Sequence, residues 1–575
     1  MAKCCVIMTH QKESGGNRLL KGLILSHPSA IISLILLSLV GTAFTLATPL
    51  IMGWLIDAVL IGKNTSLLVP IVLGMSGLFL VSAVSSYVSG NIRGKLNLVL
   101  FKELAYDIFG TVQDASLSDL QKMKTGDLMS RTVSNTTVAV NTITSVIPQV
   151  VIMICGIVLP FMIMFSLNPN LTLIASSPII LFVIWSVYYG NKVKKYQRNS
   201  LDSAGSMNSF LKEAYSIVPL TKVFLLEKWM QKKFDIHMAK YYDSSWDVVK
   251  ISSMSSSVGM VMFGIPILLV LSFGSLGVIS GSMSLGSFTA FMGYIGLFFS
   301  PIQMMSMYWT SYKSSLASFD RIGEVFSVKK EKWGTRSLSG PVKRIEFDSV
   351  DFSYDKRIVL RNFHATFTQG RNYISGDNGS GKTTIIKLLC GLYSPEKGTI
   401  SIDGQDISSL SRESLRNTVS VVFSDALIFD GTIAENILIG NTSASREDIV
   451  NAAKKAELHE FVTGLPRQYE TEVGEAGLNL SSGEKQKIAL ARVILRDSPI
   501  IVFDEFTRSI DAESKKSISS VIRQLTDKII IIITHDVNDI DDSCNRIFLN
   551  KHPDTAIPDN LAQNPPIPSP TGSII

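Results

Sequence analysis

The chain has little charge and few cysteines for its length. Only 18% of its 575 residues are Asp, Glu, Lys or Arg, whereas about a quarter is usual in soluble proteins. The net charge of +6 is small, so composition does not indicate a nucleic-acid partner. The five cysteines lack the paired spacing of a metal site. This pattern is typical of reduced thiols in a protein of the membrane or of the cytosolic side.

The shortage of charge falls in the first half, where six apolar runs of about 20 residues contain no Lys, Arg, Asp, Glu or His. These runs occupy positions 30–51, 67–88, 147–167, 171–189, 258–279 and 285–305. Because a bilayer core requires about 20 apolar residues, the sequence predicts an all-α, six-helix transmembrane domain over residues 27–325. The polar segment before it, residues 1–26, lacks the pattern of a signal peptide.

Basic residues concentrate in two long connections, between the second and third runs and between the fourth and fifth runs. The positive-inside rule places these connections and both chain ends in the cytoplasm. We therefore expect a multi-pass protein of a bacterial cytoplasmic (inner) membrane, in contact with lipid. Apolar periodicity within the connections, as at 97–101 and 224–229, predicts that helices continue tens of ångströms beyond the membrane.

The second half contains a glycine-rich segment between a predicted strand and a predicted helix. Residues 376–383 read Gly-Asp-Asn-Gly-Ser-Gly-Lys-Thr, which fits the phosphate-loop pattern. Such a loop surrounds phosphates with backbone N–H groups, while its lysine reaches the β- and γ-phosphates and its threonine binds Mg²⁺. The sequence therefore predicts a nucleoside triphosphate and Mg²⁺ as cofactors. The expected nucleotide ligands here are Gly376, Asn378, Gly379, Ser380, Gly381, Lys382, Thr383 and Thr384.

Two adjacent carboxylates follow an apolar run further along the chain. Residues 500–505 read Ile-Ile-Val-Phe-Asp-Glu, which predicts a buried strand that ends in Asp504 and Glu505. Downstream of a phosphate loop, Mg²⁺ and an attacking water need anions at such a strand end. We expect Asp504 and Thr383 to hold the metal and Glu505 to polarise the water. A salt-bridged strand end is the alternative interpretation of an isolated Asp-Glu pair.

Between these motifs, residues 480–484 read Leu-Ser-Ser-Gly-Glu and precede a predicted helix. This segment resembles the LSGGQ signature of ATP-binding cassette (ABC) proteins, and residues 337–549 resemble their cassette domain. The resemblance implies that two cassettes enclose two ATP molecules, with Ser481, Gly483 and Glu484 of one copy contacting nucleotide on the other. The predicted fold is multidomain, with the all-α membrane domain followed by an α/β P-loop nucleotide-binding domain. We expect a linker at 326–340, the cassette at 341–550 and a Pro-rich, disordered tail at 551–575.

The resemblance also assigns roles to single residues. Tyr354 matches the aromatic residue that stacks on adenine, although a core tyrosine on a strand face is the alternative. His535 matches the switch histidine that contacts the γ-phosphate, and Asp511 lies in a segment that resembles the D-loop at the cassette dimer interface. Residues 471–475 resemble the X-loop of exporters.

The sequence departs from the family pattern at two site positions. Ser424 stands where the family has a glutamine that contacts the metal, and its side chain is shorter, so a bridging water would have to restore the link. Phe506 stands where a small residue or proline is usual. With Lys382, Glu505 and His535 present as catalytic residues beside the altered Ser424, we predict that ATP hydrolysis persists but is slow.

One cassette with six spans is half a transporter of the exporter type, so the resemblance implies a dimer. A homodimer is the first expectation, and a heterodimer is the alternative. Methionines and aromatic residues in the uncharged spans suggest a small amphipathic or apolar cargo such as an antibacterial peptide, lipid or drug, and no nucleic acid. The runner-up function is a siderophore or other importer of the same architecture. A soluble regulatory ATPase is a third interpretation, which the six spans oppose.

Overall fold

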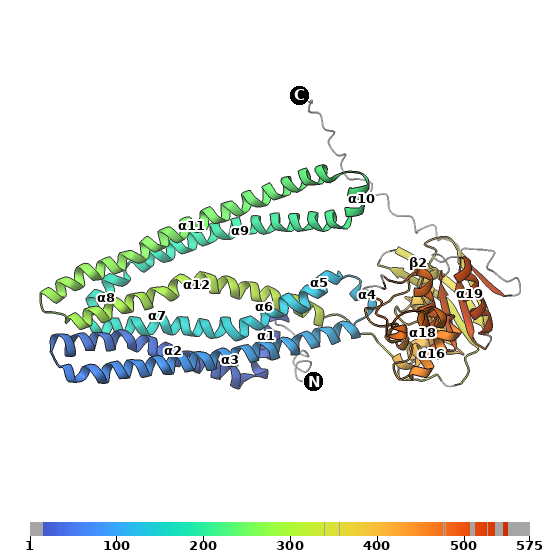
Figure 1. Ribbon diagram of the computed structural model, residues 1–575, viewed down its shortest axis with the longest axis horizontal. Helices are drawn as coiled ribbons and strands as arrows, with labels where there is room; N and C mark the ends of the chain where they lie inside the picture. The colour runs from blue at the N-terminus through green and yellow to red at the C-terminus, as the bar shows by residue number, and fades with distance from the viewer. Residues whose placement is uncertain are drawn as a thin grey trace, which may run out of the picture. The chain divides into compact units, whose positions relative to one another are not determined.

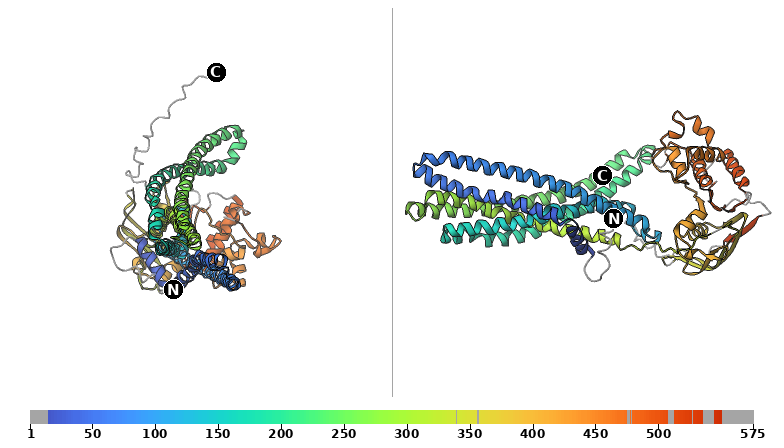
Figure 2. Two further views of the ribbon diagram at one scale, coloured as in Figure 1. Left: turned by 90° about the vertical axis from the view of Figure 1, so that its left-hand side faces the viewer. Right: turned by 90° about the horizontal axis from the view of Figure 1, so that it is seen from below.

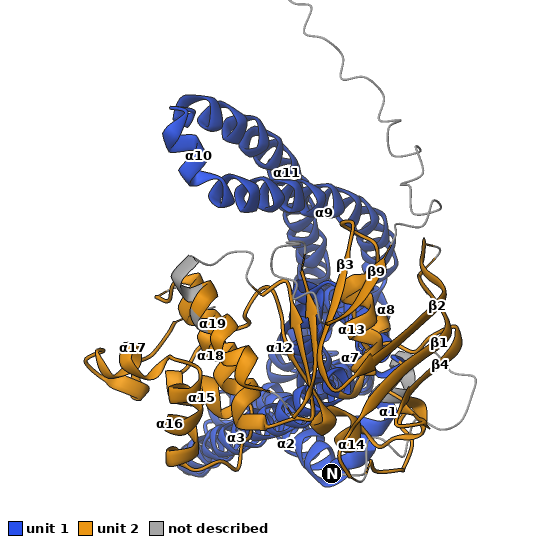
Figure 3. Ribbon diagram, turned by 90° about the vertical axis from the view of Figure 1, so that its right-hand side faces the viewer, with its two compact units in different colours: residues 1–113, 123–328 blue, residues 114–122, 329–575 orange. Residues whose placement is uncertain are grey.

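The computed structural model describes residues 15–338, 340–355, 357–474, 477, 479–506, 512–525, 527–534 and 544–549. The chain forms two compact units, coloured separately in Figure 3. Unit 1 comprises residues 1–113 and 123–328, and unit 2 comprises residues 114–122 and 329–575. Unit 2 therefore contains a short piece of the first half of the chain.

In the described residues of unit 1, all regular secondary structure is helical (Figures 1 and 2). Its longer helices are α1 (Gly15–Ser26), α2 (Pro28–Leu55), α3 (Leu68–Asp114), α7 (Ile147–Leu167), α8 (Pro169–Ser176), α9 (Pro178–Ser216), α11 (Glu227–Ile279) and α12 (Leu285–Phe326). Short helices α5 (Thr125–Ser130), α6 (Thr136–Asn141) and α10 (Val218–Val223) connect them. Six stretches of helix are long and apolar enough to cross a membrane, and each contains one of the predicted runs. The prediction of six spans is confirmed.

Several of these helices are longer than a membrane span. The 47 residues of α3 correspond to a helix of roughly 70 Å, more than twice the thickness of a bilayer core. Helices α9 and α11 lie side by side and are joined at their far end by α10 (Figure 1). Polar segments of these helices therefore continue the apolar spans, as the periodicity of the connections predicted.

Helices α2 and α12 approach very closely near the C-terminal end of α2 and the N-terminal end of α12. A Cβ atom built on Gly286 would lie 2.0 Å from the carbonyl oxygen of Gly53, so only glycine permits this crossing. Beside it, Asp57 accepts hydrogen bonds from the Gly286 N–H at 2.7 Å and from the Ser284 hydroxyl at 2.5 Å. The carboxylate thus satisfies N-terminal donors of α12 that lack partners within the helix.

Unit 2 contains two β-sheets and their covering helices (Figure 3). The antiparallel sheet has the order β2-β1-β4-β5, with β1 (Arg344–Tyr354), β2 (Arg357–Thr368), β4 (Lys397–Ile402) and β5 (Gln405–Asp406). The parallel sheet has the order β6-β7-β8-β3-β9, with β6 (Val419–Val422), β7 (Ile500–Asp504), β8 (Ile529–Ile533), β3 (Gly370–Gly376) and β9 (Asn545–Leu549). All residues of β7 and β8 are buried, as parallel strands covered on both faces require.

Alternate residues of the central strands enter two different hydrophobic cores. Val502 belongs to a core with α13 (Lys382–Leu389) and the antiparallel sheet. Its neighbour Phe503 belongs to a core with α15 (Ile433–Leu438), α16 (Arg446–Lys455), α18 (Ser482–Arg496) and α19 (Ala512–Gln524). Because successive strand residues point to opposite faces, α13 and α18 cover opposite faces of the parallel sheet.

Residues 114–122 and 329–338 pack on the cassette. The short helix α4 (Leu117–Leu120) is followed by Gln121, whose Oε1 accepts a 2.6 Å hydrogen bond from the Tyr393 hydroxyl. The Ser116 N–H donates to the carbonyl of Lys329 at 2.8 Å. Trp333 packs against the cassette core. The segment 329–338, where the sequence suggested part of a linker, is therefore part of unit 2.

Candidate functional site

The phosphate loop joins β3 to α13 at the carboxyl edge of the parallel sheet. Its three glycines all have positive φ, with 146° at Gly376, 80° at Gly379 and 101° at Gly381. A Cβ atom on Gly376 would lie 2.1 Å from the carbonyl oxygen of Leu549, on the neighbouring strand β9. The loop conformation therefore depends on residues without a side chain, as the motif predicted.

The residues of the loop fit a bound phosphate chain. Asp377, Asn378 and Gly379 are exposed, while Ser380, Gly381 and Thr384 are buried. Among the described residues, the buried hydroxyl of Ser380 has no hydrogen-bond partner. A buried polar atom without a partner costs free energy, and a phosphate oxygen would supply that partner. The N-terminus of α13 adds favourable potential for an anion.

Lys382 is buried at the base of the loop. Its Nζ donates to the carbonyl oxygens of Gly376 and Asp377, each at 2.9 Å. Burial lowers the pKa of its ammonium group, and the nearby charges of Glu505, Asp504 and Asp377 oppose that shift. The same loop thus holds the ammonium group and would surround the phosphates. Bound phosphates would neutralise the positive charge of this ammonium group.

Asp504 ends β7 and is almost completely buried. The Thr383 hydroxyl, one residue into α13, donates to its Oδ1 at 3.5 Å. Burial raises the pKa of the Asp504 carboxyl, and the hydrogen bond from Thr383 acts in the opposite direction. A buried carboxylate beside a hydroxyl provides the hard oxygen ligands that Mg²⁺ prefers, so the structure brings the two predicted metal ligands together.

Glu505 follows directly and has a φ of 45°, a conformation that is uncommon for residues other than glycine. Its N–H donates to the carbonyl of Ile533 at 3.2 Å, which fixes the turn after β7 to the end of β8. Phe506 is buried and packs on Phe503, with ring centroids 4.9 Å apart. The unusual phenylalanine is therefore a core residue, whereas Glu505 beside it is only half-buried.

Tyr354 lies next to the helix that begins at the phosphate loop. Its hydroxyl is 3.4 Å from the Thr384 hydroxyl, and the Lys387 ammonium lies 5.7 Å from its ring centroid. The ring is half-buried and contacts Phe352 and Tyr393 edge-on. The ring therefore packs on the core, as the alternative interpretation predicts, and stacking on adenine stays a prediction.

The signature segment begins α18. Ser481 is the N-cap, and its hydroxyl accepts a hydrogen bond from the Glu484 N–H at 3.3 Å. Glu484 Oε2 in turn accepts one from the Ser481 N–H at 2.7 Å. These reciprocal bonds form a capping box, and Gly483 is buried beneath it. The signature segment thus begins a helix on the face of the sheet opposite to α13, the helix that follows the phosphate loop.

Ser424 follows β6 and is exposed. Its carbonyl oxygen accepts a 2.6 Å hydrogen bond from Gln486 Nε2 of α18. Further along α18, Arg492 donates to the Leu427 carbonyl at 2.5 Å and to the Asn436 carbonyl at 2.6 Å. Burial lowers the pKa of this guanidinium to about 10. The signature helix therefore holds the segment from 424 to 436.

Sequence reasoning missed the structural roles of Gln486 and Arg492. The available signal was helical spacing, because Gln486 lies three, four and seven positions before the apolar residues 489, 490 and 493, and Arg492 directly follows the apolar run 488–491. His535 and Asp511 lie outside the described residues, as does Glu475 of the X-loop segment.

The aromatic residues proposed to face cargo mostly pack within unit 1. Tyr294, Phe298 and Phe299 of α12 are buried in a core shared with α7, α8 and α11. Met164 is fully buried in the same core, whereas Met304 is exposed. These aromatic side chains therefore hold helices to each other, and the class of cargo inferred from the uncharged spans stays a prediction.

Comparison with known proteins identifies similar chains over both halves. Residues 31–302 match the family model of the ABC transporter transmembrane region, and residues 360–508 match that of the ABC transporter. The chain is 28% identical over 527 residues to the putative multidrug export ATP-binding/permease protein YgaD of Bacillus subtilis (strain 168), covering 88% of this chain and 90% of that protein.

Two further likenesses span nearly the whole chain. An ATP-dependent lipid A-core flippase of Syntrophus aciditrophicus (strain SB) is 26% identical over 518 residues, covering 89% of this chain and 86% of the flippase. The solved structure of a bacterial Atm1-family ABC exporter with ATP bound has a TM-score of 0.77 at 24% identity, covering 91% of this chain and 94% of the exporter chain. The structural match establishes a common fold.

Proposed function

The chain belongs to the ABC transporter family as a six-span half-transporter, and we propose that two copies together use ATP to export a small amphipathic compound. The cassette makes the protein an ATPase-coupled transporter. The proposal rests mainly on one observation. The side chains of the nucleotide site, Lys382, Thr383, Asp504 and Glu505, meet at one edge of a sheet, in a chain whose other half can cross a membrane.

A dimer is supported by the position of the signature segment. Ser481 and Gly483 begin a helix on the face of the sheet opposite to α13. A second copy that faces the phosphate loop would complete the nucleotide site with its own signature. The N-terminus of α18 would then approach the terminal phosphate, where a helix dipole stabilises negative charge. Both motifs occur in this chain, which favours a homodimer.

The chemistry of the site follows from its side chains. Lys382 would place positive charge on the β- and γ-phosphates, and the helix N-terminus would hold them in position. Thr383 and Asp504 would hold Mg²⁺, which supplies charge neutralisation between the phosphates when bound. Glu505, fixed by the turn after β7, would orient a water for attack on the terminal phosphate. The shorter Ser424 would contribute less to water and metal positioning than a glutamine.

Movement of the cassettes would be transmitted to the membrane helices through the two cytoplasmic connections. Residues 114–122 already pack on the cassette through Leu117 and the Gln121–Tyr393 hydrogen bond. At the second connection, α10 and the two residues after it expose several apolar side chains: Leu220, Val223, Phe224 and Leu225. We assign these to the cassette of the second copy, because a charged cytoplasmic loop gains nothing from exposing them to water.

Export is favoured over import by the relatives, one named as a putative multidrug export protein and another as a lipid A-core flippase. Amphipathic cargo agrees with both names. The proposed location is the cytoplasmic membrane, with the cassettes on the cytoplasmic side.

The experiment is uptake into inverted membrane vesicles that contain the protein, measured with a panel of fluorescent amphiphiles. We expect ATP-dependent accumulation that is lost in Glu505→Gln, while Glu505→Gln still binds nucleotide. The matched control is Glu447→Gln on the exposed surface of α16, which should transport normally. Equal accumulation with and without ATP, or full transport by Glu505→Gln, would contradict the proposal.

A further inference from the structure

Unit 1 contains a cavity of about 530 Å³ between four helices. Each helix contributes residues three or four positions apart, which places them on one face. The lining side chains used here are Ser38, Thr42 and Thr45 of α2, Ser82, Ser85, Ser86, Ser89 and Arg93 of α3, Gln149 of α7, and Ser300, Met304 and Tyr308 of α12. The cavity volume lies within the range of small-ligand sites.

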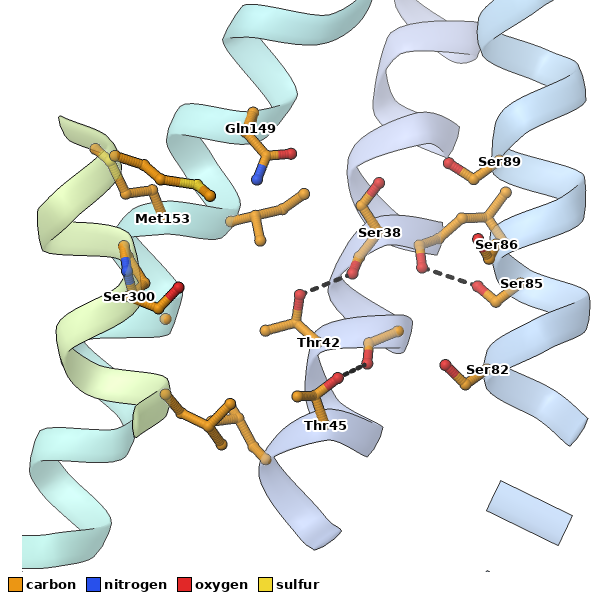
Figure 4. Close-up of a pocket in the computed structure, with 18 of the residues that line it drawn as sticks. Ser38, Thr42, Thr45, Ser82, Ser85, Ser86, Ser89, Gln149, Met153 and Ser300 are labelled. Carbon is orange, nitrogen blue, oxygen red and sulfur yellow. Dashed lines mark hydrogen bonds between the residues drawn. The ribbon is translucent and has the colours of Figure 1, made fainter. Parts of the chain in front are cut away.

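Hydroxyl groups dominate this wall (Figure 4). The four serines of α3 form a ladder opposite the hydroxyls of α2, and Gln149 and Ser300 lie across from them. Ser85 donates to the Leu37 carbonyl at 2.9 Å, and Thr42 donates to the Ser38 carbonyl at 2.9 Å. Because these two hydroxyls have donated their protons, they can accept further hydrogen bonds from a ligand, while the Gln149 amide can both donate and accept.

The only charged side chain in the lining is Arg93, and no Asp or Glu of the described residues lines the cavity. Arg93 lies about three turns beyond Ser82 on α3, at the end of the cavity where α3 continues toward residue 114. In the described part of the chain, its Nε is buried and has no hydrogen-bond partner. An unpaired buried guanidinium nitrogen costs free energy, which an anionic ligand would offset.

A second cavity, of about 340 Å³, adjoins the first at its other end. The two share Thr45, Ser82 and Leu297. The second cavity is mostly apolar, and its lining includes Phe44, Ile51, Met75, Leu78 and Phe79. Along α3 the lining thus changes from a cation, through a serine ladder, to apolar side chains.

We propose that these joined cavities bind a single-chain anionic amphiphile, with its phosphate or carboxylate on Arg93, its polar body along the serine ladder and its apolar chain in the second cavity. The inference rests on the proposed function and names the class of its cargo. It adds an anionic group to the small amphipathic cargo expected from the sequence.

Ordinary helix packing does not explain this arrangement. Small residues such as serine commonly bring membrane helices together, yet here the serines of α3 line an open volume. An arginine near a membrane boundary usually extends its charge into water, whereas Arg93 lines the cavity and buries its Nε.

The test is binding without nucleotide, using purified protein in nanodiscs of neutral lipid and thermophoresis as the readout. The acidic probes are myristoyl lysophosphatidic acid and N-myristoylglycine, which separate phosphate from carboxylate. Myristoyl lysophosphatidylcholine tests the need for net negative charge, and glycerol phosphate tests the need for the chain. We expect at least one acidic probe to bind at least tenfold more tightly than the last two.

Arg93→Gln should weaken binding of the acidic probe by roughly tenfold to a hundredfold, because one charged hydrogen-bond donor is removed. Arg93→Lys should recover part of this loss, and Lys95→Gln, an exposed residue of the same helix, should change affinity less than twofold. If Arg93→Gln does not fold, Ser86→Leu, which fills the ladder, should produce a comparable loss.

Equal affinity for the acidic and zwitterionic probes, or an unchanged affinity in Arg93→Gln, would overturn the proposal. Vesicle transport separates this result from the proposed function. If the protein transports a probe with ATP but binds it equally well without Arg93, the proposed site is wrong and the proposed export function is retained. If binding depends on Arg93 but no probe is transported with ATP, the proposed export function is wrong and the proposed site is retained.

Discussion

The two units place their polar groups in opposite ways. In the cassette, apolar residues fill β7 and β8, and the functional groups sit at strand ends and in loops at one edge of the sheet. In the membrane unit, no span has more than 39% of its most apolar window buried, so most apolar side chains face outward. Its hydroxyls and Arg93 face a cavity between helices.

Because of this difference, we expect the two sites to respond differently to single substitutions. The cassette site depends on backbone conformation within a few consecutive residues, so one added atom can abolish it. The cavity depends on side chains from four helices, so single changes should alter affinity gradually. The predictions below test this contrast, from the largest expected effect to the smallest.

Gly376→Ala should have the largest effect. The new Cβ would meet the Leu549 carbonyl at 2.1 Å, and φ at this position is 146°. We expect the cassette to lose about 3 kcal/mol of stability and most of its nucleotide affinity, measured by thermal unfolding and ATP titration. Gly370→Ala is the matched control, because φ is 94° and its Cβ would meet nothing within 4 Å. A loss no greater than in the control would contradict a steric origin.

Arg492→Met should destabilise the cassette by about 2 kcal/mol, because the carbonyl groups of Leu427 and of the buried Asn436 lose a charged donor. Faster hydrogen exchange of residues 427–436 would localise the loss. Lys487→Met on the same helix should be nearly neutral. Unchanged exchange in 427–436 would mean that α18 does not hold this segment.

The corresponding substitution in the membrane unit, Arg131→Met, should lower the free energy of unfolding by a smaller amount, about 1 kcal/mol. Arg131 pairs with Asp127 at 2.8 Å and with Glu324 at 2.6 Å, but Glu324 is exposed and can be solvated after the change. Thermal unfolding at low and high salt would measure this cost, which salt should reduce. If Arg131→Met lost more stability than Arg492→Met, the contrast between the two units would be wrong.

Ser424→Gln should raise steady-state phosphate release by about two- to tenfold, equivalent to at most about 1.4 kcal/mol in the barrier. The longer side chain would reach the metal and water that Ser424 reaches only through a bridging water. The exposed neighbour Asp425 offers a control as Asp425→Asn. Release at background level in both the native protein and Ser424→Gln would contradict persistent but slow hydrolysis.

Glu484→Gln should have the smallest effect on stability, below about 0.5 kcal/mol, because glutamine can also complete the capping box with Ser481. It removes a negative charge from the helix end that would face a phosphate. We therefore expect ATP-dependent dimerisation, measured by analytical ultracentrifugation, to strengthen about twofold. Weaker dimerisation would show that the carboxylate contributes directly to the contact between cassettes.

The sequence by itself determined the six spans, the phosphate loop and the carboxylates after β7. Each of these is encoded in consecutive residues: a run of about 20 apolar residues is sufficient to predict a span. The glycines and Lys382 are similarly fixed by a short spacing. His535 and Asp511 stay predictions from the family resemblance.

Only the tertiary structure decided which residues face each other across helices. It buried Tyr294 and Phe299 in a packing core and turned the serines of α3 toward a cavity with Arg93. It also placed residues 114–122 in the cassette unit and joined Gln486 to Ser424. Sequence periodicity can assign residues to one face of a helix, but which neighbour covers that face depends on contacts between segments far apart in the chain.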